Sequence, residues 1–217
     1  MNLLPYLSCS SMCTFEMDKQ KFLDIYVYGN KQRISKNMAY GSKLADSMEN
    51  EVASGDLLLD LMMAKLPKYD LPDMIIEDKE KGVEITNPHD GQKYVVPFIQ
   101  DRKEIIPLVA KPDSAKSDYS AFLEYKTSTK KWTQKLVDES TQLTFYATAI
   151  YLKTGKIPED IELVNVQTEY QEDGSMTVTG EIYRFKTHRT LVDILRMQSR
   201  IKKAWSGIKT LTANELL

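Results

Sequence analysis

Glu124 and Lys126 lie two residues apart in a run, 121–126, that is otherwise apolar and aromatic. If this run forms a strand, alternation places both charges on one face and Leu123 and Tyr125 on the other. Two charges on one face of an interior strand are costly to bury unless they find partners or a metal ion. The pattern therefore indicates either a structural ion pair or a catalytic pair.

Asp113 is the natural partner of this pair. It follows the apolar run 105–110 and lies eleven positions before Glu124. A turn near 116–118 would join the two segments in a hairpin and bring the two carboxylates to one point. Two carboxylates at one point repel each other, so they imply a divalent cation, and hard oxygen ligands suit Mg²⁺. Lys126 adds a compact cation able to orient a water or to stabilise a developing oxyanion.

These residues carry a resemblance. Lys111-Pro112-Asp113, ten residues and then Glu124-Tyr125-Lys126 resemble the signature of the PD-(D/E)XK nuclease superfamily. A Gln-x-x-x-Tyr motif, Gln142 to Tyr146, follows on the next expected helix, as in the RecB-like exonuclease branch. The i, i+4 spacing places both side chains on one helical face. The resemblance implies that they lie near the catalytic lysine and the nucleic-acid backbone; a helix-start glutamine above a core tyrosine is the alternative.

A third motif lies upstream, in the segment 41–49. It resembles the superfamily's first-helix motif, in which Gly, His and Glu follow one another at four-residue spacing. Glu49 matches, whereas Ala45 stands where many relatives carry a metal-binding histidine. The resemblance implies a metal site without that imidazole, with Glu49 bound directly or through water. The implied ligands are Asp113, Glu124, Glu49 and the backbone carbonyl of Tyr125.

The implied activity is that of a metal-dependent nuclease that hydrolyses DNA phosphodiester bonds with Mg²⁺ or Mn²⁺. The catalytic residues are then Asp113, Glu124, Lys126 and Glu49. A RecB-like exonuclease would act on single-stranded DNA or duplex ends in DNA recombination, repair or phage DNA processing. Endonuclease action, and RNA as the substrate, remain alternatives at this point.

A second reading is a catalytically weak or inactive DNA-binding module on the same fold, which bridges DNA to a recombination or replication protein. Ala45 and the modest net charge of −2 favour it. Some RecB-like relatives also hold an iron–sulfur cluster through one early and three late cysteines. This sequence has only Cys9 and Cys13, at i, i+4, so we expect buried thiols and no cluster.

The elements that must position these residues follow from the apolar periodicity. Helices are expected near 12–22, 37–53, 57–66, 138–153 and 191–209, and strands at 74–76, 83–85, 94–99, 105–110, 119–126, 161–168 and 176–185. We therefore predict an α/β fold with a central mixed β-sheet flanked by helices, and the resemblance implies that its core is restriction-endonuclease-like. We expect residues 1–217 to form one domain, which the resemblance implies to be a nuclease domain, with N-terminal helices in 1–66, the sheet core in 72–186 and a basic amphipathic helix in 187–217.

The last helix offers an independent argument. Four basic residues fall along one stripe, at separations of 7, 4 and 3: Arg189, Arg196, Arg200 and Lys203. Six apolar residues fall on roughly the opposite face: Leu191, Ile194, Leu195, Ile201, Trp205 and Ile208. Phosphate contacts through such a stripe would make DNA binding strongly salt-dependent. An ordinary solvated basic face is the alternative.

Charge and composition set the remaining limits. The segment 46–84 has a charge balance of −7 and the segment 181–209 one of +6, which suits one face that attracts polyanions and another that repels them. Two cysteines exclude a disulfide scaffold. No apolar run reaches membrane-spanning length, and the start lacks a basic, then apolar, signal sequence. We expect a cytoplasmic protein with no membrane partner.

Overall fold

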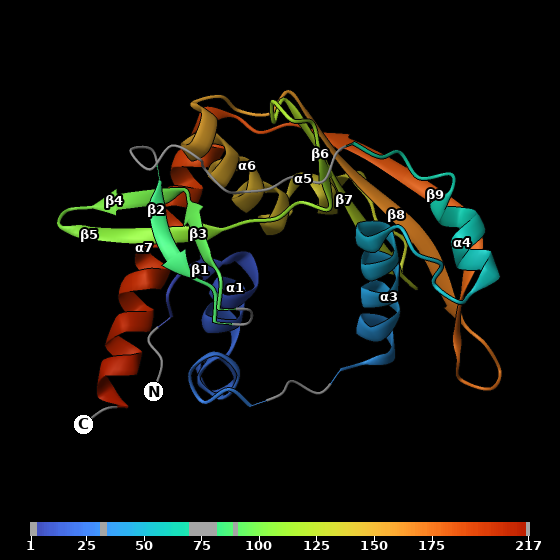
Figure 1. Cartoon of the computed structure of the whole chain (residues 1–217), viewed down its shortest axis with the longest axis horizontal. Coiled ribbons are helices and arrows are strands. Elements are labelled where there is room, and N and C mark those ends of the chain that lie inside the picture. Colours follow the sequence, from blue (N-terminus) through green and yellow to red (C-terminus); the bar gives the residue numbers. More distant parts are fainter. Residues whose placement is uncertain (1–3, 31–33, 70–81, 89–90, 216–217) are drawn as a thin grey trace.

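The computed structural model describes residues 4–30, 34–69, 82–88 and 91–215. Within them, nine strands form three sheets, with the orders β1-β5-β4, β2-β3 and β6-β7-β8-β9 (Figure 1). In chain order the strands are β1 (Leu7–Ser8), β2 (Val83–Thr86), β3 (Lys93–Val96), β4 (Phe98–Asp101), β5 (Glu104–Val109), β6 (Ser114–Ala115), β7 (Ala121–Ser128), β8 (Asp160–Tyr170) and β9 (Met176–Thr187).

The helical elements are α1 (Cys9–Met17), α2 (Lys19–Phe22), the π-helical turn η1 (Leu23–Val27), α3 (Lys36–Asn50), α4 (Leu57–Met63), α5 (Gln134–Asp138), α6 (Thr141–Thr154) and α7 (Leu191–Asn214). Polar N-cap side chains explain where the longer ones begin, because each accepts a hydrogen bond from a backbone N–H of the first turn: Ser8, Ser35, Ser140 and Thr190. Gly155 ends α6 in the left-handed conformation that glycine adopts most easily.

The four-stranded sheet is mixed and covered on both faces. β7 pairs with β6 and β8 in opposite senses, antiparallel and parallel, and β8 pairs antiparallel with β9. Alternate residues of β7 enter two apolar clusters: Phe122 packs with residues of α1, α6 and α7, whereas Leu123 and Tyr125 pack with residues of α3 and α4. The sheet therefore separates an α6 face from an α3–α4 face (Figure 1). This confirms the predicted mixed sheet flanked by helices.

Several expected boundaries differ. The first helix is divided into α1, α2 and η1, because Asp18 caps one helix and starts the next. α3 ends at Asn50, and its C-cap is Glu51, in the left-handed conformation, rather than Gly55. Pro97, which has no N–H to donate, separates β3 from β4 in the run expected as one strand. The strand expected at 74–76 lies outside the described residues.

The α7 surface also departs from expectation. Leu191 and Leu195, expected to face the core, are about half exposed, and the buried side of the helix carries Ile194, Met197, Ile201, Ala204 and Ile208. None of the helices in the described part of the chain combines the length and the apolar character needed to cross a bilayer.

Candidate active site

The predicted hairpin forms and places Asp113 beside Glu124. β6 pairs with β7 so that Ser114 lies opposite Leu123, and continuing this register by one residue sets Asp113 opposite Glu124. The Asp113 Oδ2 atom accepts a hydrogen bond from the backbone N–H of Tyr125 at 2.7 Å. The chain turns at 116–120, close to the expected position. The two carboxylates are therefore held by backbone pairing.

Glu124 is the most constrained residue of this group. It is 2% exposed, and a single oxygen of its carboxylate accepts two hydrogen bonds. Lys126 Nζ donates to Oε1 at 2.5 Å, and Gln142 Nε2 donates to the same atom at 2.6 Å. Among the described residues the other oxygen, Oε2, has no hydrogen-bond partner although it is buried. A buried acceptor without a donor is energetically costly, so this oxygen favours a ligand.

The Gln-x-x-x-Tyr motif lies against this carboxylate. Gln142 and Tyr146 share one face of α6, as their spacing predicts, and Gln142 Nε2 also donates to the Tyr146 hydroxyl at 2.8 Å. The Tyr146 ring meets Phe122 of β7 edge to face, with centroids 6.1 Å apart. In this structure Gln142 holds the Glu124 carboxylate, and the role of Gln142 and Tyr146 in positioning the substrate strand stays a prediction. The motif thus belongs to the interior of the site.

Burial shifts the ionisation of both carboxylates. It raises the pKa of Glu124 to about 7, although the neighbouring Lys126 ammonium opposes the shift and the Asp113 charge adds to it. Burial likewise raises the pKa of Asp113, against the backbone N–H of Tyr125. The pKa of Tyr146 is raised well above its ordinary value by burial and by Glu124. The site thus carries unfavourable negative charge that a cation would relieve.

The donor chemistry fits a divalent ion, but the acidic set is smaller than expected. Asp113 and Glu124 offer hard oxygen donors, which suit Mg²⁺ or Mn²⁺. Across 4–30, 34–69, 82–88 and 91–215, no three His, Cys, Asp or Glu side chains form a group able to hold a metal. Glu49, at the end of α3, is paired with Lys111 instead. In the structure Glu49 therefore does not join Asp113 and Glu124, and the Tyr125 carbonyl stays a predicted metal ligand.

The predicted basic stripe on the last helix does not form as a whole. Arg189 precedes α7 and is buried, where its guanidinium donates to the hydroxyls of Thr144 and Thr187 at 2.8 and 2.7 Å and to the Val137 carbonyl at 3.0 Å. Its predicted place in a DNA-facing stripe is wrong, because these buried acceptors already take its donors. Arg189 instead ties the start of α7 to α5 and α6.

The other three residues of the predicted stripe differ among themselves. Arg200 donates to both carboxylate oxygens of Glu16 on α1, at 2.8 and 2.6 Å, and to the Thr141 hydroxyl at 3.0 Å. Arg196 is exposed and lines a hollow of about 410 Å³ whose wall also includes Asp138 and Asp193. Lys203 is exposed. Hence only Arg196 and Lys203 present their charge outward, as predicted for substrate binding.

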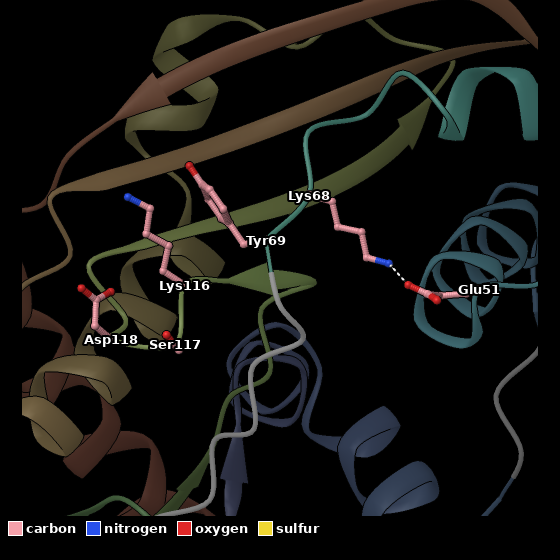
Figure 2. Close-up of a pocket in the computed structure, with 6 residues that line it drawn as sticks. All are labelled: Glu51, Lys68, Tyr69, Lys116, Ser117 and Asp118. Carbon is pink, nitrogen blue, oxygen red and sulfur yellow. Dashed lines mark hydrogen bonds and ion pairs between the residues drawn. The ribbon is translucent and has the colours of Figure 1, made fainter.

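A larger hollow, of about 650 Å³, lies elsewhere and was not predicted (Figure 2). Its wall comes from three separate segments: Glu51, Lys68, Tyr69, Lys116, Ser117 and Asp118. Lys68 pairs with Glu51 at 2.5 Å, and the Lys116 ammonium lies 5.6 Å from the centroid of the Tyr69 ring. Tyr69 packs with the apolar cluster of α3 and α4, so this hollow does not belong to the α6 face that carries Glu124. Its residues are too scattered in the sequence to form a motif.

The fold is shared with solved structures of nuclease type. A candidate exonuclease from Eubacterium rectale is similar with a TM-score of 0.51 at 13% identity, over 97% of this chain and 82% of that one. A phage-related exonuclease from Haemophilus somnus 129PT is similar with a TM-score of 0.51 at 10% identity, over 97% and 96% of the two chains. Identity this low shows a common fold alone. No family model and no curated protein matches the sequence.

Proposed function

We propose that this chain is a divalent-metal-dependent nuclease of the PD-(D/E)XK type that hydrolyses phosphodiester bonds in DNA. One observation carries the proposal: Asp113 and Glu124 converge, and Lys126 and Gln142 both donate to one oxygen of Glu124, while the other oxygen is buried and has no donor among the described residues. A purely structural ion pair has no reason to leave that oxygen unpaired. The fold shared with exonucleases supports the same conclusion.

The side chains have separate tasks in this proposal. Asp113 and Glu124 would hold Mg²⁺ or Mn²⁺, with the Tyr125 carbonyl as a third donor. The ion, when bound, supplies positive charge that activates water and offsets the charge of the scissile phosphate. Gln142 fixes the rotation of the Glu124 carboxylate so that Oε2 stays available, and Tyr146 holds Gln142 in turn. Lys126 places an ammonium beside the reacting phosphate, where it orients water or stabilises developing charge.

The finer assignment is an exonuclease of the RecB-like branch. The Gln-x-x-x-Tyr motif supports the branch, because Gln142 and Tyr146 occur at its spacing on the helix after the Glu-x-Lys strand. The substrates would be single-stranded DNA or duplex ends, in recombination, repair or phage DNA processing. Residues 1–217 would act as one nuclease domain. The exposed Arg196 and Lys203 would contact the phosphates of the bound strand.

Cleavage assays test this function. Labelled linear and closed circular DNA, single- and double-stranded, is incubated with the protein in Mg²⁺, in Mn²⁺ and in EDTA. We expect metal-dependent degradation of linear DNA and protection of closed circles. Asp113→Asn and Glu124→Gln should abolish cleavage. Glu162→Gln is the matched control, because Glu162 is a buried carboxylate on the adjacent strand that pairs with Arg184 instead. Cleavage unchanged in both site variants would refute the assignment.

The second candidate is a DNA-binding module without catalysis. The pairing of Glu49 with Lys111, together with Ala45 in place of a histidine, favours it, because both reduce the number of metal ligands. Calorimetric titration with Mg²⁺ and Mn²⁺ separates the two candidates. Binding that disappears in Asp113→Asn supports the nuclease. DNA binding without any Asp113-dependent metal binding supports the module.

A further inference from the structure

Asn165 lies next to Lys126 on the face of the sheet that carries Glu124. β7 and β8 run parallel, and their register pairs Lys126 with Asn165. Two residues earlier on β8, Leu163 packs in the apolar cluster that contains α6, whereas Val164 and Val166 pack in the cluster of α3 and α4. Because side chains alternate along a strand, Asn165 shares the α6 face with Leu163. It is therefore the nearest cross-strand neighbour of the proposed catalytic lysine.

The Asn165 side chain is fully buried but only half satisfied. It is 0% exposed. Its Nδ2 donates to the backbone carbonyl of Lys126 at 3.0 Å and to the Ser128 hydroxyl at 3.1 Å. In the part of the chain that the structure describes, its Oδ1 has no donor. The amide thus fixes the end of β7 through its nitrogen, and its Oδ1 is left without a donor among the described residues, on the strand position that pairs with Lys126.

Lys126 has donors to spare for such an acceptor. Its ammonium carries three N–H groups, and the ion pair with Glu124 Oε1 uses one of them. Its side chain is 31% exposed and hangs on a flexible stem, so one contact alone holds it loosely. When a cation binds Glu124, the attraction between that carboxylate and the ammonium weakens. A second acceptor is then needed to keep the ammonium in place.

We propose that Asn165 is a positioning residue for Lys126. Its nitrogen anchors the Lys126 carbonyl and the Ser128 hydroxyl. Its Oδ1, which has no donor among the described residues, accepts a hydrogen bond from the Lys126 ammonium once a cation engages Glu124. The ammonium thereby stays beside the two carboxylates when Glu124 engages a cation. The contact rests on the proposed metal site, and only its catalytic meaning rests on the proposed nuclease function.

Gln167 provides a matched control on the same strand and face. It lies two residues beyond Asn165, is buried, and its Oε1 also has no donor within the described residues. Its register partner is Ser128 rather than Lys126. Removing the Gln167 amide therefore tests the loss of a buried polar group without a loss of contact to the lysine.

The first experiment compares the kinetics of Asn165→Leu, Asn165→Asp and Gln167→Met with saturating Mg²⁺ on linear DNA. We expect Asn165→Leu to lower kcat by about 10- to 100-fold with little change in KM, as misplacement of a catalytic group does. Asn165→Asp keeps an acceptor but loses the donor to the backbone, and it should retain most of kcat. Gln167→Met should stay close to the wild type. Equal losses in Asn165→Asp and Asn165→Leu would reduce Asn165 to a backbone anchor and overturn the proposal.

The second experiment does not depend on catalysis or on the tolerance of a buried aspartate. Unfolding by urea is measured in saturating Mg²⁺ for Lys126→Met, Asn165→Leu and the double variant, and in parallel for Lys126→Met with Gln167→Met. Lys126→Met keeps the backbone carbonyl, so the cycle isolates the side-chain contact. We expect the effects on the unfolding constant to depart from multiplicativity by about threefold or more for Asn165 and not for Gln167. Multiplicative effects in both pairs would overturn the proposal, whereas an inactive wild type with coupled Asn165 and Lys126 would count against the nuclease function alone.

Discussion

Two regions of this molecule concentrate charged side chains, and they differ in how completely those side chains are paired. At the β6–β7 hairpin, Asp113, Glu124 and Lys126 converge, and one buried oxygen of Glu124 has no donor in the part of the chain that the structure describes. Around the start of α7, the donors of Arg189 and Arg200 meet hydroxyls, a carbonyl and a carboxylate. Charged groups that stabilise a fold tend to have partners for all their polar atoms. A site that must bind a ligand keeps at least one polar atom without a protein partner. The hairpin therefore carries the proposed chemistry, and α7 mainly supports it.

The largest expected effect separates the two regions by activity. Lys126→Met should lower the cleavage rate by about 10²–10³-fold, because it removes a preorganised charge at the reacting phosphate. Lys203→Met removes the same charge from α7 and should change kcat little. Initial rates at saturating linear DNA and Mg²⁺, with circular dichroism to verify folding, measure the difference. A similar loss in both variants would place the chemistry outside the hairpin.

The second effect is on stability. Arg189→Met should destabilise the fold by about 3 kcal/mol, because buried hydroxyl and carbonyl acceptors lose a charged donor. The free energy of unfolding from urea titration measures this loss. Activity per folded molecule should stay near that of the wild type. A stable variant with weakened DNA binding would restore Arg189 to the role of a phosphate contact.

The hairpin could be predicted from the sequence because local patterns specify it. The apolar strands, the charges at 113, 124 and 126 and the i, i+4 pair at 142 and 146 each depend on short-range spacing. Whether Arg189 and Arg200 face the solvent or are paired depends on Glu16, Thr144 and other partners distant in the sequence. A helical wheel does not include these partners. Asn165 carried a readable signal: it alternates with Gln167 in an apolar strand, so two amides share one buried face. That the side-chain oxygens of these two amides have no donor among the described residues could be seen only in the structure, together with the register of β7 and β8.

The third effect concerns the cost of the proposed site. Glu124→Gln should stabilise the metal-free protein by about 2 kcal/mol at pH 8, because it removes a buried charge. Burial raises the pKa of Glu124 from its ordinary value of 4.5 to about 7. A raised pKa in the folded state means that this group favours folding below pH 4.5 and loses that contribution as the pH rises to about 7. The gain of the variant should therefore grow across this window.

Chemical denaturation in EDTA between pH 4 and 8 measures this difference. Glu162→Gln is again the control, since that buried carboxylate keeps its partner Arg184. A gain that does not vary with pH, or a loss of stability at pH 8, would mean that the wild-type carboxylate is fully compensated by Lys126 and Gln142. The hairpin would then resemble the paired charges near α7.

The smallest effect divides α7 itself. Exposed cations that displace counterions from DNA add to the salt dependence of binding, by about 0.9 in the log–log slope for each phosphate neutralised on duplex DNA. Lys203 is exposed, and no carboxylate among the described residues pairs with it, so Lys203→Gln should lower the slope by about that amount. Arg200 already binds Glu16, so Arg200→Gln should leave the slope nearly unchanged and lower stability by about 1 kcal/mol. Fluorescence anisotropy with labelled DNA in Ca²⁺, at salt concentrations from about 50 to about 300 mM, gives both slopes. If Arg200→Gln lowered the slope as much as Lys203→Gln, Arg200 would have to exchange Glu16 for a phosphate on binding, and α7 would be a second substrate contact after all.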